Sequence, residues 1–176
     1  KFTKKPSVTI SKQPVAVTCK QGDTNKTVSV EVTKDPNDDN TKVSYQWYYS
    51  SYSNGSSATA VSESMDGKKA TCKIDTSTYG VRYYFCEISV ERNDTVPGDK
   101  VTTNAVKVDV KAPYRVTITR ANTGTNTVGA SVLYYAKLEK YTNDGYTLAE
   151  SGTGKDYTSF AVVSNNSKIA YVTGGS

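Results

Sequence analysis

Apolar and polar residues alternate in short runs along the whole chain, and this alternation is the main signal in the sequence. In an extended strand successive side chains point to opposite faces, so alternation at period two predicts half-buried β-strands. Gly, Pro, Asn and Asp separate the runs, and no stretch of useful length repeats apolar residues with helical spacing. Val, Thr and Tyr are abundant and Leu is scarce, which also favours strands. We therefore predict an all-β protein.

The first 111 residues contain seven predicted strands at short spacing, which is the number that a β-sandwich needs. They cover residues 7–10, 15–19, 28–32, 43–49, 69–74, 81–90 and 101–110. Pro14 lies just before the second strand. Because proline is tolerated at a sheet edge, it would let the chain pass from one sheet to the other. The pattern predicts a β-sandwich over residues 1–111.

Two aromatic strings mark the middle of this predicted sandwich. The string Tyr45-Gln46-Trp47-Tyr48-Tyr49 predicts a strand with Trp47 buried on its inner face. Tyr84 lies two residues before Cys86 and follows a turn at Tyr79-Gly80. This is the spacing of a tyrosine corner, which leads into the strand that packs on the Trp. Trp47 and Tyr84 are therefore the expected markers of the fold.

A second domain is predicted to begin at Lys111-Ala112-Pro113, directly after the last strand of the first. Its predicted strands cover residues 114–121, 130–141, 146–150, 157–163 and 168–172. Asn143-Asp144-Gly145 is a turn between two of them. We predict that residues 112–176 form five or six antiparallel strands in a small β-sandwich or barrel. A domain of this size is only marginally stable without a neighbour.

The residue types that most catalytic sites need are missing. The chain has no His, which excludes Ser-His-Asp and Cys-His nucleophilic sites and His-ligated metals. It has no Gly-rich phosphate-binding motif, and three dispersed Cys lack the ligand spacing of a zinc site. Asp35, Asp38 and Asp39 share an acidic loop without the alternating spacing of a calcium loop. We predict a protein that is not an enzyme and needs no cofactor or metal.

The charge and hydropathy of the chain narrow the class of partner. The net charge of +5 is carried by Lys and Arg scattered among Asp and Glu, whereas nucleic-acid binding proteins cluster their basic residues. No segment approaches the ~20 apolar residues that span a bilayer. We therefore expect a soluble monomer that binds no nucleic acid and inserts in no membrane. The start lacks an initiating Met and an apolar leader, so we expect a piece of a longer protein.

The three cysteines leave their redox state open. Cys72 and Cys86 are both predicted to face inward on their strands, so a Cys72–Cys86 disulfide is one alternative. Cys19, on the preceding strand, could instead reach Cys86. In the third alternative all three are small, buried hydrophobic residues in reduced form.

Four strings in the first domain carry a family resemblance. They are Val43-Ser44-Tyr45-Gln46-Trp47-Tyr48, Lys73-Ile74-Asp75-Thr76-Ser77-Thr78-Tyr79-Gly80, Tyr83-Tyr84-Phe85-Cys86 and Thr103-Asn104-Ala105-Val106-Lys107-Val108. With these, residues 5–111 resemble the immunoglobulin-like domains of cell-surface and secreted proteins of Gram-positive bacteria. The resemblance implies extracellular display, a spacer or adhesive role and no catalysis. The predicted strand at 28–32 lacks the Cys of the usual immunoglobulin disulfide. Residues 112–176 resemble no family.

Tyrosine is the candidate recognition residue. Together with Ser, Gly and Asn it makes up the binding loops of many recognition proteins, because its large ring gives contact area at low entropic cost. In the second domain alternation places Tyr134 in the core and Tyr135 and Tyr141 on the opposite, wetter face, with Tyr146 across the turn. We predict an exposed strip of Tyr135, Tyr141 and Tyr146, and Tyr157 as a further binding residue.

Three functions follow from these observations. The first is an adhesin-like fragment of a bacterial surface or secreted protein that binds a host protein, such as an immunoglobulin, with the first domain as scaffold. The second is a carbohydrate-binding module in which the tyrosine rings stack on sugars. The third is a structural spacer. A planar row of rings would favour the glycan, and a convex or edge-strand patch would favour a protein.

Overall fold

The computed structural model describes residues 5–93, 96–120, 134–150 and 155–156, and of Tyr134 only the backbone. The chain divides into two compact units, Lys1–Lys111 and Ala112–Ser176. The architecture is all-β, as the alternation predicts, and its described part contains one short 3₁₀ turn at Glu63–Met65. Among these residues no helix is long and apolar enough to cross a membrane.

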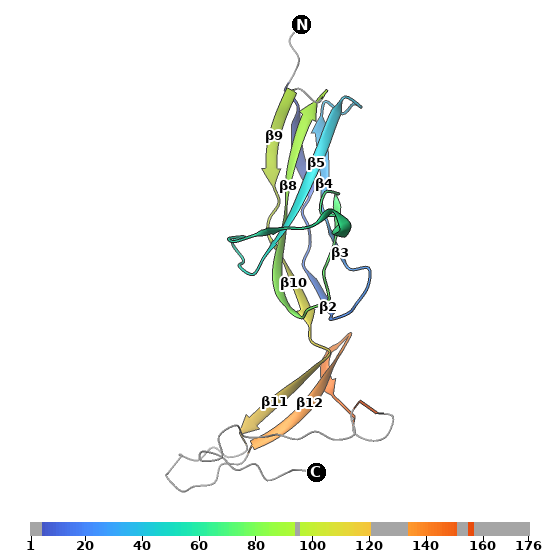
Figure 1. Cartoon of the computed structure of the whole chain (residues 1–176), viewed down its shortest axis with the longest axis vertical. Helices are drawn as coiled ribbons and strands as arrows, with labels where there is room; N and C mark the ends of the chain where they lie inside the picture. The colour runs from blue at the N-terminus through green and yellow to red at the C-terminus, as the bar shows by residue number, and fades with distance from the viewer. Residues whose placement is uncertain (1–4, 94–95, 121–133, 151–154, 157–176) are drawn as a thin grey trace. The chain divides into compact units, whose positions relative to one another are not determined.

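The larger sheet of the first unit is built around its two longest strands, β5 and β8 (Figure 1). Its strands in spatial order are β2 (Val17–Lys20), β10 (Val106–Lys111), β8 (Gly80–Arg92), β5 (Thr41–Ser50) and β6 (Thr59–Ala60), with β9 (Val96–Thr102) also paired to β8. The pairing of β5 with β8 is antiparallel and places Trp47 opposite Cys86. The two aromatic strings of the sequence are therefore neighbours in one sheet.

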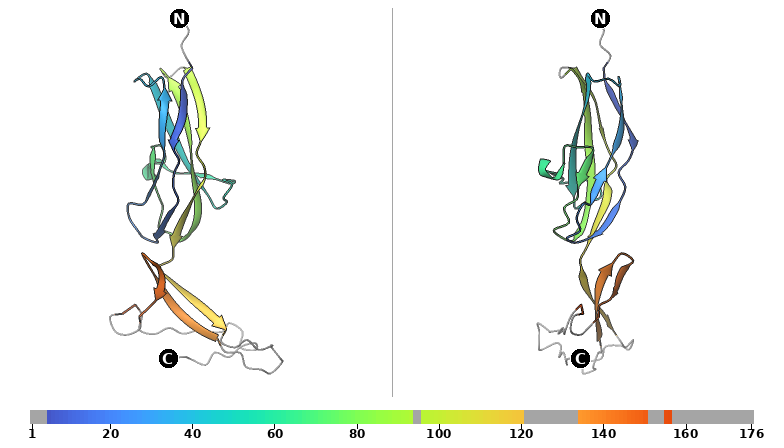
Figure 2. Two further views of the ribbon diagram at one scale, coloured as in Figure 1. Left: turned by 180° about the vertical axis from the view of Figure 1, so that it is seen from behind. Right: turned by 90° about the vertical axis from the view of Figure 1, so that its right-hand side faces the viewer.

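The opposing layer consists of two short antiparallel pairs. They are β1 (Ser7–Lys12) with β4 (Glu31–Asp35), and β3 (Thr27–Ser29) with β7 (Thr71–Lys73). Seen from behind in Figure 2, β1 and β4 lie in front of the larger sheet. The first unit is thus a β-sandwich.

The structure confirms that the chain changes sheets around Pro14. Strand β1 pairs with β4 in the smaller layer, whereas β2 runs parallel to β10 in the larger sheet. Proline lacks a backbone N–H and fixes φ, so it interrupts the ladder at the crossing point.

Two strands predicted as continuous are broken. The predicted strand 28–32 divides at Val30, whose N–H donates to Ala70 O (3.0 Å). The predicted strand 101–110 divides at Thr103, whose N–H donates to Cys86 O (2.9 Å) and whose Oγ1 accepts from Cys86 N (2.9 Å). A side-chain hydroxyl therefore replaces a backbone group in the ladder, which alternation alone does not reveal.

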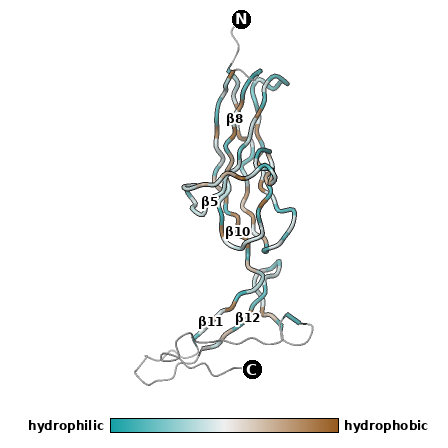
Figure 3. The backbone as a smooth tube through the Cα atoms, in the orientation of Figure 1, coloured by the Kyte–Doolittle hydropathy of each residue, from teal (hydrophilic) through white to brown (hydrophobic). Residues whose placement is uncertain are grey.

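The core of the first unit lies between the two layers. Trp47, Tyr84, Cys86 and Ile88 are almost completely buried, and apolar residues recur along β8 and β10 in Figure 3. The Trp47 indole N–H donates to Lys69 O (2.8 Å), so its one polar atom is satisfied. Tyr84 forms a hydrogen bond with the Asp75 backbone upstream, as a tyrosine corner requires. Both predicted fold markers thus lie where the sequence predicts.

The described part of the second unit is a three-stranded antiparallel sheet. Its strands are β11 (Tyr114–Arg120), β12 (Tyr134–Thr142) and β13 (Gly145–Leu148), in that spatial order. Gly145 (φ +113°), the last residue of the predicted turn, adopts a conformation that other residues rarely take. The predicted strands 157–163 and 168–172, and the predicted inward orientation of the Tyr134 side chain, lie outside the described residues.

Candidate functional site

The predicted tyrosine strip lies on one face of the three-stranded sheet. Cross-strand neighbours share a face, and the register pairs Tyr141 with Tyr146, Glu139 with Leu148 and Tyr135 with Thr119. Tyr135, Tyr141, Tyr146 and Leu148 therefore all belong to this face. We call it the tyrosine face.

Tyr141 and Tyr146 form a fixed pair at one end of the tyrosine face. Their ring centroids are 5.2 Å apart at an interplanar angle of 66°, an edge-to-face contact. The Tyr146 hydroxyl donates to Ala112 O (2.8 Å). The guanidinium of Arg115 lies 4.0 Å from the centre of the Tyr146 ring, close enough for a cation–π interaction. These contacts hold both rings in one orientation.

Glu139 completes this cluster. Its Oε2 accepts from Arg115 Nε (2.9 Å) and from Thr117 Oγ1 (2.5 Å). The hydrogen bond from Arg115, followed by that from Thr117, lowers the pKa of the Glu139 carboxyl below its ordinary value. The carboxylate therefore stays ionised and keeps Arg115 over the ring.

Tyr135 stands apart from the pair. It lies six residues before Tyr141 on β12 with Lys137 and Glu139 between them on the same face, and its side chain is 57% exposed. The structure thus brings Tyr141 and Tyr146 together as a half-buried pair and leaves Tyr135 as a separate exposed ring, so the prediction that all three are exposed is wrong for Tyr141 and Tyr146. Leu148, 65% exposed, is a member of the face that sequence analysis missed. The register of β12 and β13 would have revealed it. Tyr157 lies outside the described residues.

A second aromatic surface lies on the outer face of the larger sheet in the first unit. The rings of Tyr48 and Phe85 are stacked, 5.4 Å apart and 15° from parallel. The loop after β5 reaches Phe85, since a Cβ on Gly55 would lie 3.1 Å from that ring. This loop carries Tyr52, which is 59% exposed. Phe85 was missed because it lies between two core positions of β8.

The loop that carries Tyr52 is ordered by its own hydrogen bonds. Ser50 Oγ donates to Ser56 O (2.5 Å) and accepts from Tyr52 N (2.9 Å). Gly55 N donates to Tyr52 O (3.0 Å), and Asn54 Oδ1 accepts from Ser56 N (3.0 Å). A loop satisfied in this way presents Tyr52 at little further entropic cost.

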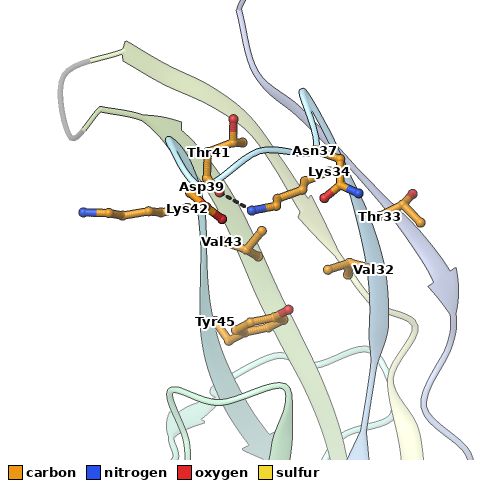
Figure 4. Close-up of a pocket in the computed structure, with 9 residues that line it drawn as sticks. All are labelled: Val32, Thr33, Lys34, Asn37, Asp39, Thr41, Lys42, Val43 and Tyr45. Atoms are coloured by element: carbon orange, nitrogen blue, oxygen red, sulfur yellow. Dashed lines mark hydrogen bonds between the residues drawn. The ribbon is translucent and has the colours of Figure 1, made fainter.

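The first unit also contains an open groove of about 570 Å³ between β4 and β5 (Figure 4). It is lined by Val32, Thr33, Lys34, Asn37, Asp39, Thr41, Lys42, Val43 and Tyr45. Val32, Val43 and Tyr45 lie between the two strands in Figure 4, whereas Lys42 points away. The groove therefore has an apolar floor and a polar rim.

Cys72 and Cys86 are buried in the interior, as predicted, and the thiols of all three cysteines are free. Cys19, Cys72 and Cys86 are buried and form no disulfide in the structure. Burial raises the pKa of Cys72 and of Cys86 to about 12. Thiols with such a pKa are almost entirely protonated at neutral pH and are poor nucleophiles. This arrangement corresponds to the third alternative, buried cysteines in reduced form.

The acidic loop is occupied by contacts within the protein. Burial favours the neutral form of Asp38, but hydrogen bonds from Thr41 and Arg92 outweigh it and lower the carboxyl pKa. Asp38 Oδ2 lies 2.8 Å from Arg92 Nη1. Within the described ranges, no group of three or more His, Cys, Asp or Glu residues is placed to hold a metal ion.

Neither a scan against protein-family models nor a search of curated proteins finds a match to this chain.

Proposed function

We propose that this chain is a non-catalytic recognition segment of a bacterial surface or secreted protein, displayed outside the cell, that binds a host protein. The first unit is an immunoglobulin-like scaffold, and the tyrosine face of the second unit makes the contact. An immunoglobulin is the first partner to test, since the family that residues 5–111 resemble includes adhesive proteins.

The observation that carries the proposal is the 66° angle between the rings of Tyr141 and Tyr146. A sugar ring stacks on flat, coplanar aromatic surfaces, and two rings at this angle offer no such platform. A folded protein surface needs fixed aromatic anchors with polar groups beside them. The pair, fixed by Arg115, together with exposed Tyr135 and Leu148, supports a protein partner over the glycan alternative.

The test compares two exposed tyrosines in the full chain. Tyr135→Ala removes a ring from the tyrosine face, and Tyr79→Ala removes an equally exposed ring (61%) from the first unit. Immobilised protein is exposed to purified immunoglobulin and to serum glycoproteins, and in parallel to a glycan array. We expect saturable binding that Tyr135→Ala weakens about tenfold or more, as for an interface hot spot. Tyr79→Ala should leave it unchanged.

Three results would contradict the proposal. Glycan binding without protein binding would favour a carbohydrate-binding module. No binding in either the protein assay or the glycan array would favour a structural spacer. Equal losses in both variants would mean that the tyrosine face has no special part in recognition.

A further inference from the structure

The groove lies between β4 of the smaller layer and β5 of the larger sheet. Strand β4 pairs with β1 on one side only, and among the described residues no strand pairs with its other edge. Strand β5 pairs with β8 along its length, but β6 covers only Tyr48 and Tyr49 on the other edge. Two unpaired strand edges therefore border the same groove.

The backbone groups of β5 that point into this opening can be identified from Trp47. Its N–H donates to Gly67 O (2.8 Å) and its C=O accepts from Val61 N (2.8 Å), both on the side away from β8. Backbone groups alternate sides along a strand at period two. The N–H and C=O groups of Tyr45 and Val43 consequently point to that same side, where no strand of the described part pairs with them.

The same reasoning applies to β4. The Val30 N–H donates to Ala70 O, on the side of β7. Two and four residues later, the backbone groups of Val32 and Lys34 point to this side, away from β1. All four residues with outward-pointing backbone groups, Val32, Lys34, Val43 and Tyr45, line the groove.

Two sets of hydrogen bonds mark the limits of the open edge of β5 and so set the length of a guest. At one end the Lys34 ammonium donates to Asp38 O (2.8 Å) and Thr41 O (2.6 Å). At the other end Gln46 Nε2 donates to Val61 O (3.1 Å). The open edge of β5 between them spans Lys42 to Gln46, roughly 17 Å at 3.4 Å per residue. This length fits a segment of about five residues.

From this arrangement we infer that the groove binds an extended segment of a partner polypeptide, which adds as a strand beside β5. The guest backbone exchanges hydrogen bonds with Val43 and Tyr45, and one apolar guest side chain rests on the floor formed by Val32, Val43 and Tyr45. Peptide backbone is the ligand that supplies donors and acceptors at the spacing of a strand edge. The inference rests on the proposed recognition of a protein partner.

The charges at the rim indicate which segment fits. Among the charged residues that line the groove, Lys34 lies between the two strands and Lys42 points away, and the one carboxylate of the lining belongs to Asp39. The hydrogen bonds of Lys34 described above go to neutral carbonyls, so its positive charge favours an acidic residue beside the apolar anchor of the guest. Lysines along an open edge also oppose pairing between two copies of the same strand. The fitting occupant is therefore a foreign strand and not a second copy of this chain.

The experiment selects peptides from a phage-displayed library of random twelve-residue sequences against the full chain. Amide hydrogen exchange then maps where each selected peptide binds. We expect peptides with an acidic residue near an apolar one, and at least tenfold slower exchange of the Val43 and Tyr45 amides when they are bound. Selection of no peptide above background, or protection confined to other residues, would overturn the inference. So would protection of the same amides that grows with protein concentration in the absence of peptide.

Val43→Pro is the decisive variant. It removes an outward N–H without touching the ladder to β8, and proline is tolerated at such an edge. Peptide affinity should fall at least tenfold, whereas Val15→Pro, at an exposed position outside the strands, should leave it unchanged. If Val43→Pro fails to fold, Val32→Tyr fills the floor while leaving every backbone donor in place and should block the peptide equally. Unaltered affinity in the folded variant would refute the inference.

The same variants separate this inference from the proposed function. Immunoglobulin binding that depends on Tyr135, combined with no peptide at the groove, would leave the function standing and remove only the inference. A peptide bound at the groove, combined with no effect of Tyr135→Ala on protein binding, would support the inference and contradict the proposed role of the tyrosine face.

Discussion

The two units of the chain hold their strands together in different ways. In the described part of the first unit fourteen buried residues form one apolar cluster between two layers. In the described part of the second unit Ala149 is the one buried apolar residue. Its sheet is tied instead by side-chain contacts on one face, such as Arg115 with Glu139 and Tyr141 with Tyr146. Hydrophobic burial dominates stability, so the first unit should respond to substitutions far more strongly than the second.

The second unit, which has fewer buried apolar residues in its described part, exposes more large apolar side chains for its length than the first. Large apolar side chains that are exposed in the first unit are Val15, Tyr52, Tyr79 and Val81, spread over more than a hundred residues. In the much shorter described part of the second unit they are Tyr114, Val116, Ile118, Tyr135 and Leu148. Tyr135 and Leu148 belong to the tyrosine face, whereas Tyr114, Val116 and Ile118 alternate with its residues and belong to the opposite face. The contrast supports the proposal that the first unit is the scaffold and that the second unit supplies the contact surface.

The largest effect is expected from the centre of the first core. Trp47→Ala removes a fully buried ring and leaves Lys69 O without its donor. Truncation of a buried aromatic costs roughly 3–5 kcal/mol. Chemical denaturation should show a loss of this size, whereas Tyr79→Ala should change the free energy of unfolding by less than about 0.5 kcal/mol, as surface substitutions do. A loss below about 1 kcal/mol for Trp47→Ala, smaller than any such truncation, would contradict the role of this core.

A smaller loss is expected where the chain packs backbone against backbone. A Cβ on Gly67 would overlap Val61 O and lie 2.8 Å from Ser62 O, and neither carbonyl can rotate away as a side chain could. Gly67 O also accepts from Trp47 N. Gly67→Ala should therefore destabilise the first unit by roughly 1–3 kcal/mol, the usual cost of overpacking. Thermal unfolding would measure it, with exposed Lys68→Ala as the control. Equal melting temperatures for the two variants would show that the loop relaxes freely.

The strands of the first unit were predictable because their signals are local. The alternation around Trp47 and the spacing of Tyr84 and Cys86 depend only on residues close in sequence. Pro14 predicts the change of sheet for the same reason, since a missing N–H needs no partner to be recognised. The break at Thr103 was not predictable, because it depends on a hydroxyl meeting Cys86, seventeen residues away.

The candidate sites were harder to predict because they depend on register. Alternation places Tyr135 and Tyr141 on one face, but only the pairing of β12 with β13 brings Tyr146 and Leu148 to it. The contact of Arg115 with Tyr146 joins the first and third strands of the second unit's sheet. The groove was not predicted because it depends on two strand edges with which no described strand pairs. Local sequence patterns indicate where strands form, but they do not indicate which strand edges stay unpaired.

The smallest expected effect concerns the cluster on the tyrosine face. Hydrogen bonds from Arg115 and then Thr117 lower the pKa of Glu139 from 4.5. Because the folded pKa is the lower one, Glu139 contributes stability above the ordinary carboxyl range, and this contribution is lost as pH falls through the lowered value. In Arg115→Ala the NMR titration midpoint of Glu139 should return toward 4.5, and the acid-side loss of stability should shrink.

Lys155→Ala provides the control for that titration. It removes the exposed contact of Lys155 with Glu150 (2.9 Å) and takes the same charge from the second unit. A general effect of net charge would move the Glu139 midpoint in both variants, whereas a direct hydrogen bond moves it only in Arg115→Ala. An unchanged midpoint in Arg115→Ala would mean that the guanidinium does not hold Glu139. The orientation of the Tyr146 ring would then depend on its hydroxyl bond to Ala112 and its contact with Tyr141, and the tyrosine face would lose part of the rigidity on which its proposed role in recognition depends.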